Sequence, residues 1–128
     1  MALNIQIKRS LDPAHRGTAT VELTGSLDTA TSPDLERGIA PLLDGSVKDL
    51  VFDLAGLSFI SSAGLRVFGI ARKRLKESGG QVVFVHMQPQ IKEVFEIIKA
   101  LPGLAVFKDT AEFDAYIAIR QRRDRDED

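Results

Sequence analysis

Apolar and polar residues alternate at the start of the chain, and this pattern predicts a pair of strands. Leu3, Ile5 and Ile7 alternate with polar neighbours, which is the period-two pattern of a strand with one buried face. A short turn-forming stretch with proline and glycine follows. Residues 18–23 are then rich in β-branched side chains, and Gly25 is expected to end this second strand. Because the connection is short, we predict an antiparallel hairpin.

Beyond the hairpin, segments with helical spacing of apolar residues alternate with short apolar runs. The expected helices begin at Ser32, Ser62, Gln88 and Asp109. Strands are expected between them at residues 50–54, 82–85 and 104–107. Ser32 is expected to cap its helix, since a proline follows at the first helical position. The run at 50–54 is densely apolar, so we expect that strand to be covered on both faces.

This order of elements predicts one α/β domain. We expect a single-layer, mostly parallel β-sheet with an N-terminal antiparallel strand, and about five strands and four helices. The domain is expected to span residues 1–119, because a chain of 128 residues suits one domain. Residues 120–128 lack apolar side chains, so we expect a charged, disordered tail there.

Composition narrows the classes of function. The chain has no cysteine, which excludes disulfides, zinc–thiolate sites and thiol nucleophiles. Its acidic residues are scattered along the sequence, so we expect no metal site. Neither a phosphate-binding GxxxxGK(S/T) loop nor a GxGxxG turn occurs, and we expect no cofactor. The formal net charge of −1 gives little support for direct nucleic-acid binding. No window approaches the roughly 20 apolar residues of a membrane span, so we expect a soluble cytoplasmic protein without membrane insertion.

The segment that leads to Ser62 carries the main functional signal. A buried strand is expected to end near Leu54, and the apolar pair at 59–60 to anchor a loop before the next helix. Ala63 and Gly64 are small, so we expect another surface to approach the backbone there. The free N–H groups of a helix start favour negative charge at this place.

Ser62 has two compatible interpretations. The ordinary one is a helix N-cap, whose hydroxyl accepts a backbone hydrogen bond worth about 1 kcal/mol. The other is a phosphorylation switch, because a phosphoryl group adds about −1.5 to −2 charges beside any docked partner. The helix that follows is basic, and it forms either a solvated face or a docking face for an acidic partner. Its basic residues are Arg66, Arg72, Lys73, Arg74 and Lys76.

These segments resemble the STAS domain family, whose best-known members are bacterial anti-sigma factor antagonists. The resemblance spans residues 3–119 and rests on residues 23–28, 51–54, 59–65 and the glycines at 79–80. It implies that Ser62 is phosphorylated by a partner that is both serine kinase and anti-sigma factor, and that a serine phosphatase reverses this. It also implies that Asp28 contributes to partner binding or kinase recognition. Many antagonists carry an aspartate where this chain has Ser61, which makes Ser61 an alternative phosphorylation site.

Three functional hypotheses follow. The first is an anti-sigma factor antagonist that has no catalytic residue and is not an enzyme. Its partner-binding residues would be Asp28, Ser61, Ser62, Ala63, Gly64, Leu65 and Arg66. The second is a STAS subunit of a larger assembly, such as a stressosome, lipid-transport or sensor complex, without a phosphorylation switch. The third, a hydrolase with Ser62 as nucleophile, lacks the glycine two residues before the serine that a nucleophile elbow needs.

Overall fold

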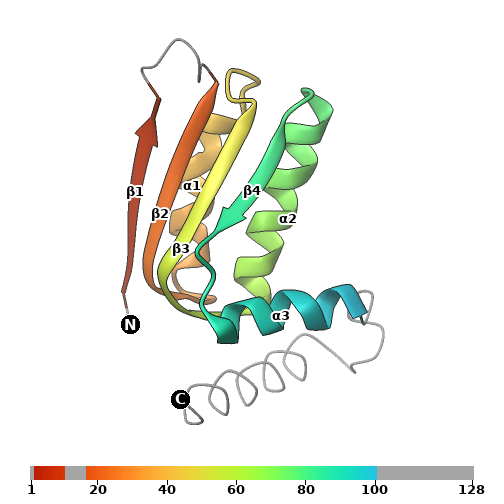
Figure 1. Ribbon diagram of the computed structural model, residues 1–128. Helices are drawn as coiled ribbons and strands as arrows, with labels where there is room; N and C mark the ends of the chain where they lie inside the picture. The colour runs from red at the N-terminus through yellow and green to blue at the C-terminus, as the bar shows by residue number, and fades with distance from the viewer. Residues whose placement is uncertain (1, 11–16, 101–128) are drawn as a thin grey trace.

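The computed structural model describes residues 2–10 and 17–100 (Figure 1). Its strands are β1 (Leu3–Arg9), β2 (Thr18–Leu27), β3 (Asp49–Ile60) and β4 (Gln81–Val85). Its helices are α1 (Ser32–Ile39), the short 3₁₀ helix η2 (Ala40–Leu43), α2 (Ser62–Glu77) and α3 (Pro89–Ala100). The strand expected at 104–107, the helix expected from Asp109 and the expected tail lie outside the described residues.

The four strands form one mixed sheet in the order β1-β2-β3-β4. β1 pairs with β2 in antiparallel orientation, as the predicted hairpin requires. The pairs β2–β3 and β3–β4 are parallel, with α1 and η2 in the first connection and α2 in the second. The predicted fold class, a mostly parallel sheet with an antiparallel N-terminal strand, is confirmed.

In the described part of the chain, α1 and α2 lie on the same face of the sheet (Figure 1). Burial alternates along β3: Leu50, Phe52 and Leu54 are buried, whereas Val51 and Asp53 are only half-buried. Residues at successive strand positions point to opposite faces, so the helices cover one face and leave the other partly open. The expectation that this strand is covered on both faces is therefore wrong for the described residues.

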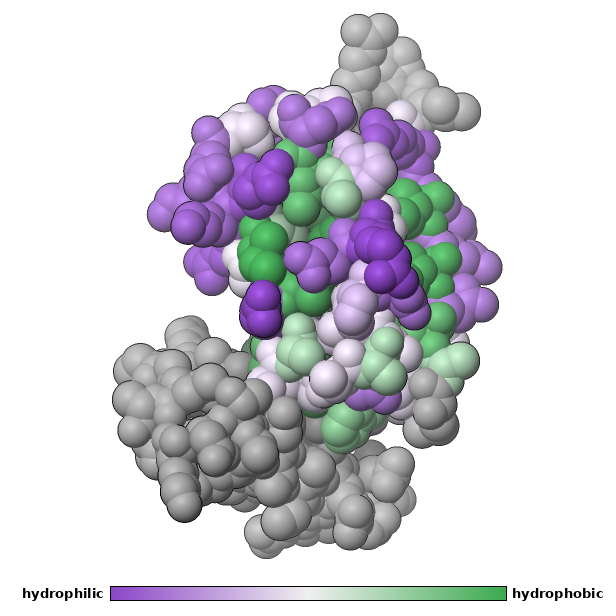
Figure 2. All heavy atoms as spheres, turned by 180° about the vertical axis from the view of Figure 1, so that it is seen from behind, coloured by the Kyte–Doolittle hydropathy of each residue, from purple (hydrophilic) through white to green (hydrophobic). Residues whose placement is uncertain are grey.

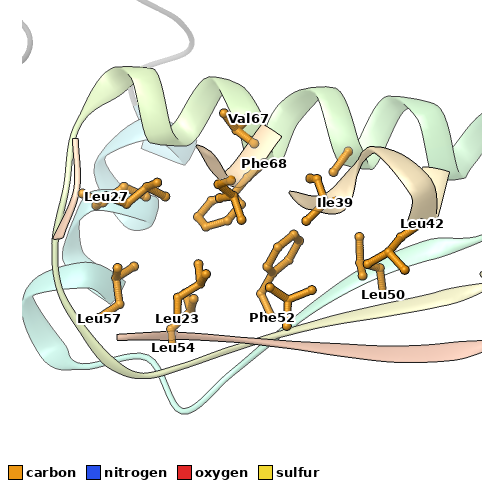
Figure 3. Close-up of a cluster of buried hydrophobic side chains, with 14 of the residues drawn as sticks. Leu23, Leu27, Ile39, Leu42, Leu50, Phe52, Leu54, Leu57, Val67 and Phe68 are labelled. Carbon is orange, nitrogen blue, oxygen red and sulfur yellow. The ribbon is translucent and has the colours of Figure 1, made fainter. Parts of the chain in front are cut away.

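Aromatic and aliphatic side chains fill the space between the sheet and the helices (Figure 3). Phe52 on β3 packs against Phe68 on α2 with ring centroids 4.8 Å apart. Phe84 on β4 lies 5.1 Å from Phe68 and 5.1 Å from Phe95 on α3. Tilted and edge-to-face ring pairs of this kind add about 0.5–1.5 kcal/mol each beyond their buried area. The aromatic cluster thus holds α2 at a defined place over the sheet.

Two strands run further than their sequence pattern predicts. β2 continues through Gly25 to Leu27, and β3 continues past Leu54 to Ile60. The register of the β2–β3 pairing shifts at two places near the end of β2, first between Glu22 and Thr24 and again between Gly25 and Ser26. Gly25 has φ +109° and faces the backbone of Ala2, just before β1, so closely that a Cβ atom would clash with it. The glycine that suggested a strand end lies inside β2, beside register shifts at which β3 carries the extra residues.

Side chains of the β4–α3 connection support the far end of β3. β4 ends opposite Asp53, so β3 has no β4 partner beyond that residue. The side-chain amide of Gln88 donates a hydrogen bond to the carbonyl oxygen of Ala55 at 2.8 Å. The buried amide of Gln90 donates to the carbonyl oxygen of Ser58 at 3.4 Å. On the β4 side of β3, these two side chains thus bind carbonyl oxygens that no longer have a β4 partner. On its other side, β3 stays paired with β2 as far as Ile60.

Candidate functional site

The carboxyl ends of β2 and β3 lie side by side, because these strands are parallel neighbours. Leu27 pairs with Ile60, and Asp28 and Ser61 directly follow them in the chain. The backbone N–H of Ser61 donates a hydrogen bond to the carbonyl oxygen of Leu27 at 2.9 Å. The structure thus brings the sequence-predicted Asp28 next to the start of α2. We call this region, residues 28 and 61–66, the strand-end site.

Asp28 begins the turn between β2 and α1, and Thr31 holds its carboxylate in place. The backbone N–H of Thr31 donates to Asp28 Oδ1 at 3.0 Å. In return, the backbone N–H of Asp28 donates to Thr31 Oγ1 at 2.9 Å. Asp28 is half-buried, and no described residue bonds to its Oδ2 atom. The carboxylate is therefore fixed at one oxygen and available to a partner at the other.

Thr31 is a residue that the sequence analysis missed. It is the N-cap of α1, whereas Ser32, the predicted cap, is the first residue of the helix. The Ser32 hydroxyl donates instead to the carbonyl oxygen of Asp28 at 2.6 Å. The usual capping-box pattern does not mark Thr31, because its side chain bonds back to the turn at Asp28 and makes no bond into the helix.

α2 begins at Ser62, as predicted, but its N-cap lies one residue earlier than expected. Ser61 is the N-cap, with extended backbone angles, and Ser62 is the first helical residue. Ser61 is only 6% exposed, and its Oγ atom has no hydrogen-bond partner in the described part of the chain. Ser62 is half-buried, so it is the more accessible of the two serines. The interpretation of Ser62 as N-cap is therefore wrong, and accessibility favours it over Ser61 as a modification site.

The four residues after Ser62 divide between the interior and the surface. Gly64 is buried, and a Cβ atom on it would lie 2.6 Å from Leu27 Cγ and 3.1 Å from Ile60 Cγ1. The small size of Gly64 thus lets α2 pack closely against the ends of β2 and β3. Gly64 therefore supports the strand-end site from the interior and does not contact a partner. Ala63 and Leu65 are half-buried and Arg66 is exposed. These three are the neighbours of Ser62 that a partner can reach.

Exposed basic side chains run along the outer side of α2. Arg66, Arg72, Lys73, Arg74 and Lys76 are all exposed. None of them forms an ion pair with another described residue. Seen from behind, the molecule shows hydrophilic residues interleaved with smaller hydrophobic patches (Figure 2). The charge on α2 is therefore not neutralised by the described part of the chain.

The described histidine and the acidic residue beside it lie away from the strand-end site. His86, which follows β4, has its Nδ1 atom 3.2 Å from Asp53 Oδ1, and Asp53 Oδ1 also accepts the N–H of Ala55 at 3.1 Å. No group of three or more metal-ligating side chains occurs within residues 2–10 and 17–100. Across the same ranges, no helix is both long and apolar enough to cross a bilayer. His15, the other histidine of the chain, lies outside the described residues.

Comparison with known proteins gives one consistent result. The sequence profile described as STAS domain matches residues 11–113. BtrV of Bordetella bronchiseptica, assigned as an anti-sigma factor antagonist, is 39% identical over 75 residues. That match covers 59% of this chain and 65% of BtrV, so the chain spans just under two thirds of that relative. The anti-sigma-B factor antagonist of Staphylococcus aureus is 29% identical over 77 residues, which cover 60% of this chain and 71% of that protein.

Solved structures with the same fold include the anti-sigma factor antagonist SpoIIAA. Its unphosphorylated form superimposes with a TM-score of 0.62 at 21% identity, over 73% of this chain and 83% of SpoIIAA. The phosphorylated form of SpoIIAA, described as a Bacillus cell fate determinant, gives 0.61 at 21% identity, over 73% and 82%. At this level of identity the likeness concerns the fold.

Proposed function

The chain belongs to the STAS domain family, and from this premise we propose that it is an anti-sigma factor antagonist. In its unphosphorylated form it binds an anti-sigma factor that is also a serine kinase, and this binding frees the sigma factor. Phosphorylation of Ser62 ends the complex, and a serine phosphatase restores the binding form. These partners act in the cytoplasm, where we place the chain as well. The named antagonists among its relatives support this role.

One observation carries the proposal: the parallel pairing of β2 and β3 places Asp28 beside the start of α2. Asp28 offers a fixed carboxylate with a free oxygen, and Ser62 offers an accessible hydroxyl. Arg66 adds a positive charge to the same region. A partner that docks here therefore meets both signs of charge and the modified residue within one small surface. Such charged groups mainly determine specificity and association rate.

The chemistry of the switch belongs to the partner kinase. The Ser62 hydroxyl oxygen forms a bond to the γ-phosphorus of ATP, while the bond between that phosphorus and the leaving ADP oxygen breaks. The hydroxyl proton passes to a base on the kinase. The chain supplies only the nucleophilic oxygen, so it acts as a substrate and not as an enzyme. Hydrolysis by the phosphatase breaks the bond between Ser62 Oγ and phosphorus.

The added charge explains why the complex separates while the fold persists. The positive end of α2 stabilises a negative group by about 0.3–1 kcal/mol, so phosphorylation does not oppose the helix. At an interface, an unmatched charge costs about 2–5 kcal/mol. This corresponds to an affinity loss of roughly 30-fold to 4,000-fold. The same modification is thus tolerated by the chain and disfavoured by the bound partner.

The experiment that tests the proposal is intact-mass measurement after incubation with candidate anti-sigma kinases, ATP and magnesium. The unaltered chain, Ser62→Ala and Ser61→Ala are compared, and co-purification with each kinase is measured without ATP. We expect one added phosphoryl group that only Ser62→Ala abolishes. Loss only in Ser61→Ala would transfer the site to Ser61. No phosphorylation, together with a stable complex with other proteins, would favour a STAS subunit of a larger assembly.

A further inference from the structure

Arg66 lies one helical turn beyond Ser62 on the same side of α2. An α-helix has about 3.6 residues per turn, so side chains four positions apart are surface neighbours. The opposite side of α2 faces the core, and its buried residues are Gly64, Val67, Phe68, Ala71 and Leu75. Ser62 and Arg66 are both outside this set, and Arg66 is exposed.

The fold itself does not account for the charge of Arg66. It forms no ion pair with any other described residue. Arg66 lies just beyond the first turn of α2, so the dipole at the helix start does not stabilise its charge either. Arg74 and Lys76 lie in the last turn of the same helix, where the dipole favours them. Arg66 is therefore a cation that the described part of the unmodified chain leaves unpaired, and it is the basic residue of α2 nearest to Ser62 in the sequence.

We propose that Arg66 is the intramolecular partner of the phosphate on Ser62, an inference that rests on the phosphorylation of Ser62 proposed above. In the unphosphorylated chain its guanidinium is free to bind a carboxylate of the anti-sigma factor. After phosphorylation, its N–H groups donate to the phosphate oxygens, for which guanidinium geometry is well suited. Phosphorylation then has two effects on the partner: it adds a negative charge and withdraws a docking cation.

The neighbouring charges are consistent with this pairing. Asp28, across the strand ends, is an acid and repels a phosphate at Ser62. Among the described residues of the strand-end site, Arg66 is the one cation. Lys73 lies on the same side of α2, but it is about 16 Å from Ser62 along the helix axis. That distance exceeds the Debye length of about 8 Å at physiological salt, so Lys73 serves as a matched control.

The test uses chains in which phosphoserine is installed at position 62 during synthesis, so no kinase is needed. The phosphate pKa is measured by ³¹P NMR in the unaltered sequence and in Arg66→Gln, Arg66→Lys and Lys73→Gln. We expect Arg66→Gln to raise this pKa by about 0.3, the size of an exposed ion pair at this helical spacing. Arg66→Lys should give a smaller rise, and Lys73→Gln none. An unchanged pKa in Arg66→Gln, or an equal rise in Lys73→Gln, would overturn the proposal.

Binding measurements test the second effect separately. With the anti-sigma factor present, phosphorylation should weaken binding by a larger factor in the unaltered chain than in Arg66→Gln, which has no cation to withdraw. Equal factors would show that Arg66 does not take part in release. The antagonist proposal would fail in a different measurement, through no phosphorylation by any kinase or no complex with one. The ³¹P titration could still be interpreted in that case, because its phosphoserine is installed without a kinase.

Discussion

The backbone N–H of Ser61 donates a hydrogen bond to the carbonyl oxygen of Leu27 at 2.9 Å, and this bond ties the two halves of the strand-end site together. Leu27 is followed by Asp28, and Ser61 is followed by Ser62. The relative position of Asp28 and Ser62 is therefore set by backbone pairing and does not depend on a flexible side chain. Backbone bonds of this kind are insensitive to most substitutions, so side chains at the site can be changed one at a time.

Asp28 is expected to affect binding and stability through different atoms. Asp28→Asn keeps an oxygen that accepts the Thr31 N–H but removes the charge. We expect its free energy of unfolding to stay within about 0.5 kcal/mol of the unaltered chain, and its affinity for the anti-sigma factor to fall. Asp28→Ala also loses the acceptor, so its stability should fall by about 1 kcal/mol. Urea unfolding and calorimetric titration measure both quantities, and undiminished binding by Asp28→Asn would remove Asp28 from the interface.

Two glycines of α2 are expected to respond to alanine in opposite directions. Gly64→Ala places a methyl group 2.6 Å from Leu27 Cγ, so it should destabilise the fold by about 1–3 kcal/mol. Gly69 is exposed, and a Cβ atom there would have no neighbour within 4 Å. Gly69→Ala should therefore stabilise the chain by about 0.5–1 kcal/mol through helix propensity. Thermal and urea unfolding check both signs; a loss of stability in Gly69→Ala would contradict the open surroundings of that residue.

The hydroxyls of Thr31 and Ser61, the N-cap residues of α1 and α2, are expected to contribute differently to stability. Thr31→Ala loses the hydroxyl that accepts the N–H of Asp28 and donates to the carbonyl oxygen of Ser26 at 2.9 Å. We expect a loss of about 1–2 kcal/mol for this change, because these backbone groups lose their partner in the turn. Ser61→Ala removes a buried hydroxyl that has no partner among the described residues, so it should change stability by less than about 0.5 kcal/mol. A large loss in Ser61→Ala would mean that its hydroxyl caps α2 in solution.

Phe52 is expected to be a main contributor to the position of α2. It is fully buried, and its ring packs against Phe68 and Phe84. Phe52→Ala should destabilise the fold by about 3–5 kcal/mol, because it leaves a cavity among these rings. Ile7→Ala is the matched control: Ile7 is 39% exposed on the edge strand, so its loss should be about 1 kcal/mol or less. Denaturant unfolding measures both, and similar losses would contradict this account of the core.

Asp44 is expected to show a local dependence on pH. The hydroxyl of Ser46, and then its backbone N–H, donate to the Asp44 carboxylate and lower the pKa of that group below its ordinary value of 3.8. The stabilisation is present above pH 3.8 and is lost as the pH falls through the lower pKa of the folded chain. An NMR titration of the Asp44 carboxyl should show its pKa rising toward the ordinary value in Ser46→Ala. No rise would mean that the hydroxyl does not hold the carboxylate.

Elements with strong periodicity could be predicted from the sequence, whereas strand ends and caps could not. The helix expected at 88–99 appears as Pro89–Ala100, because its apolar spacing is a local property. Gly25 suggested a strand end because glycine weakens strands locally. Its place inside β2 depends on the close approach of the Ala2 backbone, which only the folded chain reveals. Val51 likewise suggested burial on both faces, although a β-branched residue also suits a half-buried strand position.

In the candidate site, too, some features could be predicted from the sequence and others depend on the folded chain. Ser62 and Asp28 were identified through resemblance to a family motif, and the structure supplies the reason for their proximity in the pairing of Leu27 with Ile60. Thr31 was missed because its role is a bond to the backbone of Asp28, which depends on the path of the turn. Gly64 was expected to face an outside surface, but whether a small residue faces inward or outward follows from the helix orientation. That orientation depends on the packing of Phe68 on α2 against Phe52 and Phe84 of the sheet.

The parallel pairing of β2 and β3 also has a consequence for how the protein is made. Parallel strands meet only after the intervening segment has closed a long loop, so this contact forms late compared with local helices. A chain that has not yet paired these strands carries every residue of the motif but does not present Asp28 and Ser62 together. Newly synthesised or heat-damaged copies are therefore expected neither to capture the anti-sigma factor nor to serve as good kinase substrates. The amount of anti-sigma factor bound would then depend on the number of folded copies of the chain. Proteolysis and chaperones would change that number without any change in phosphorylation.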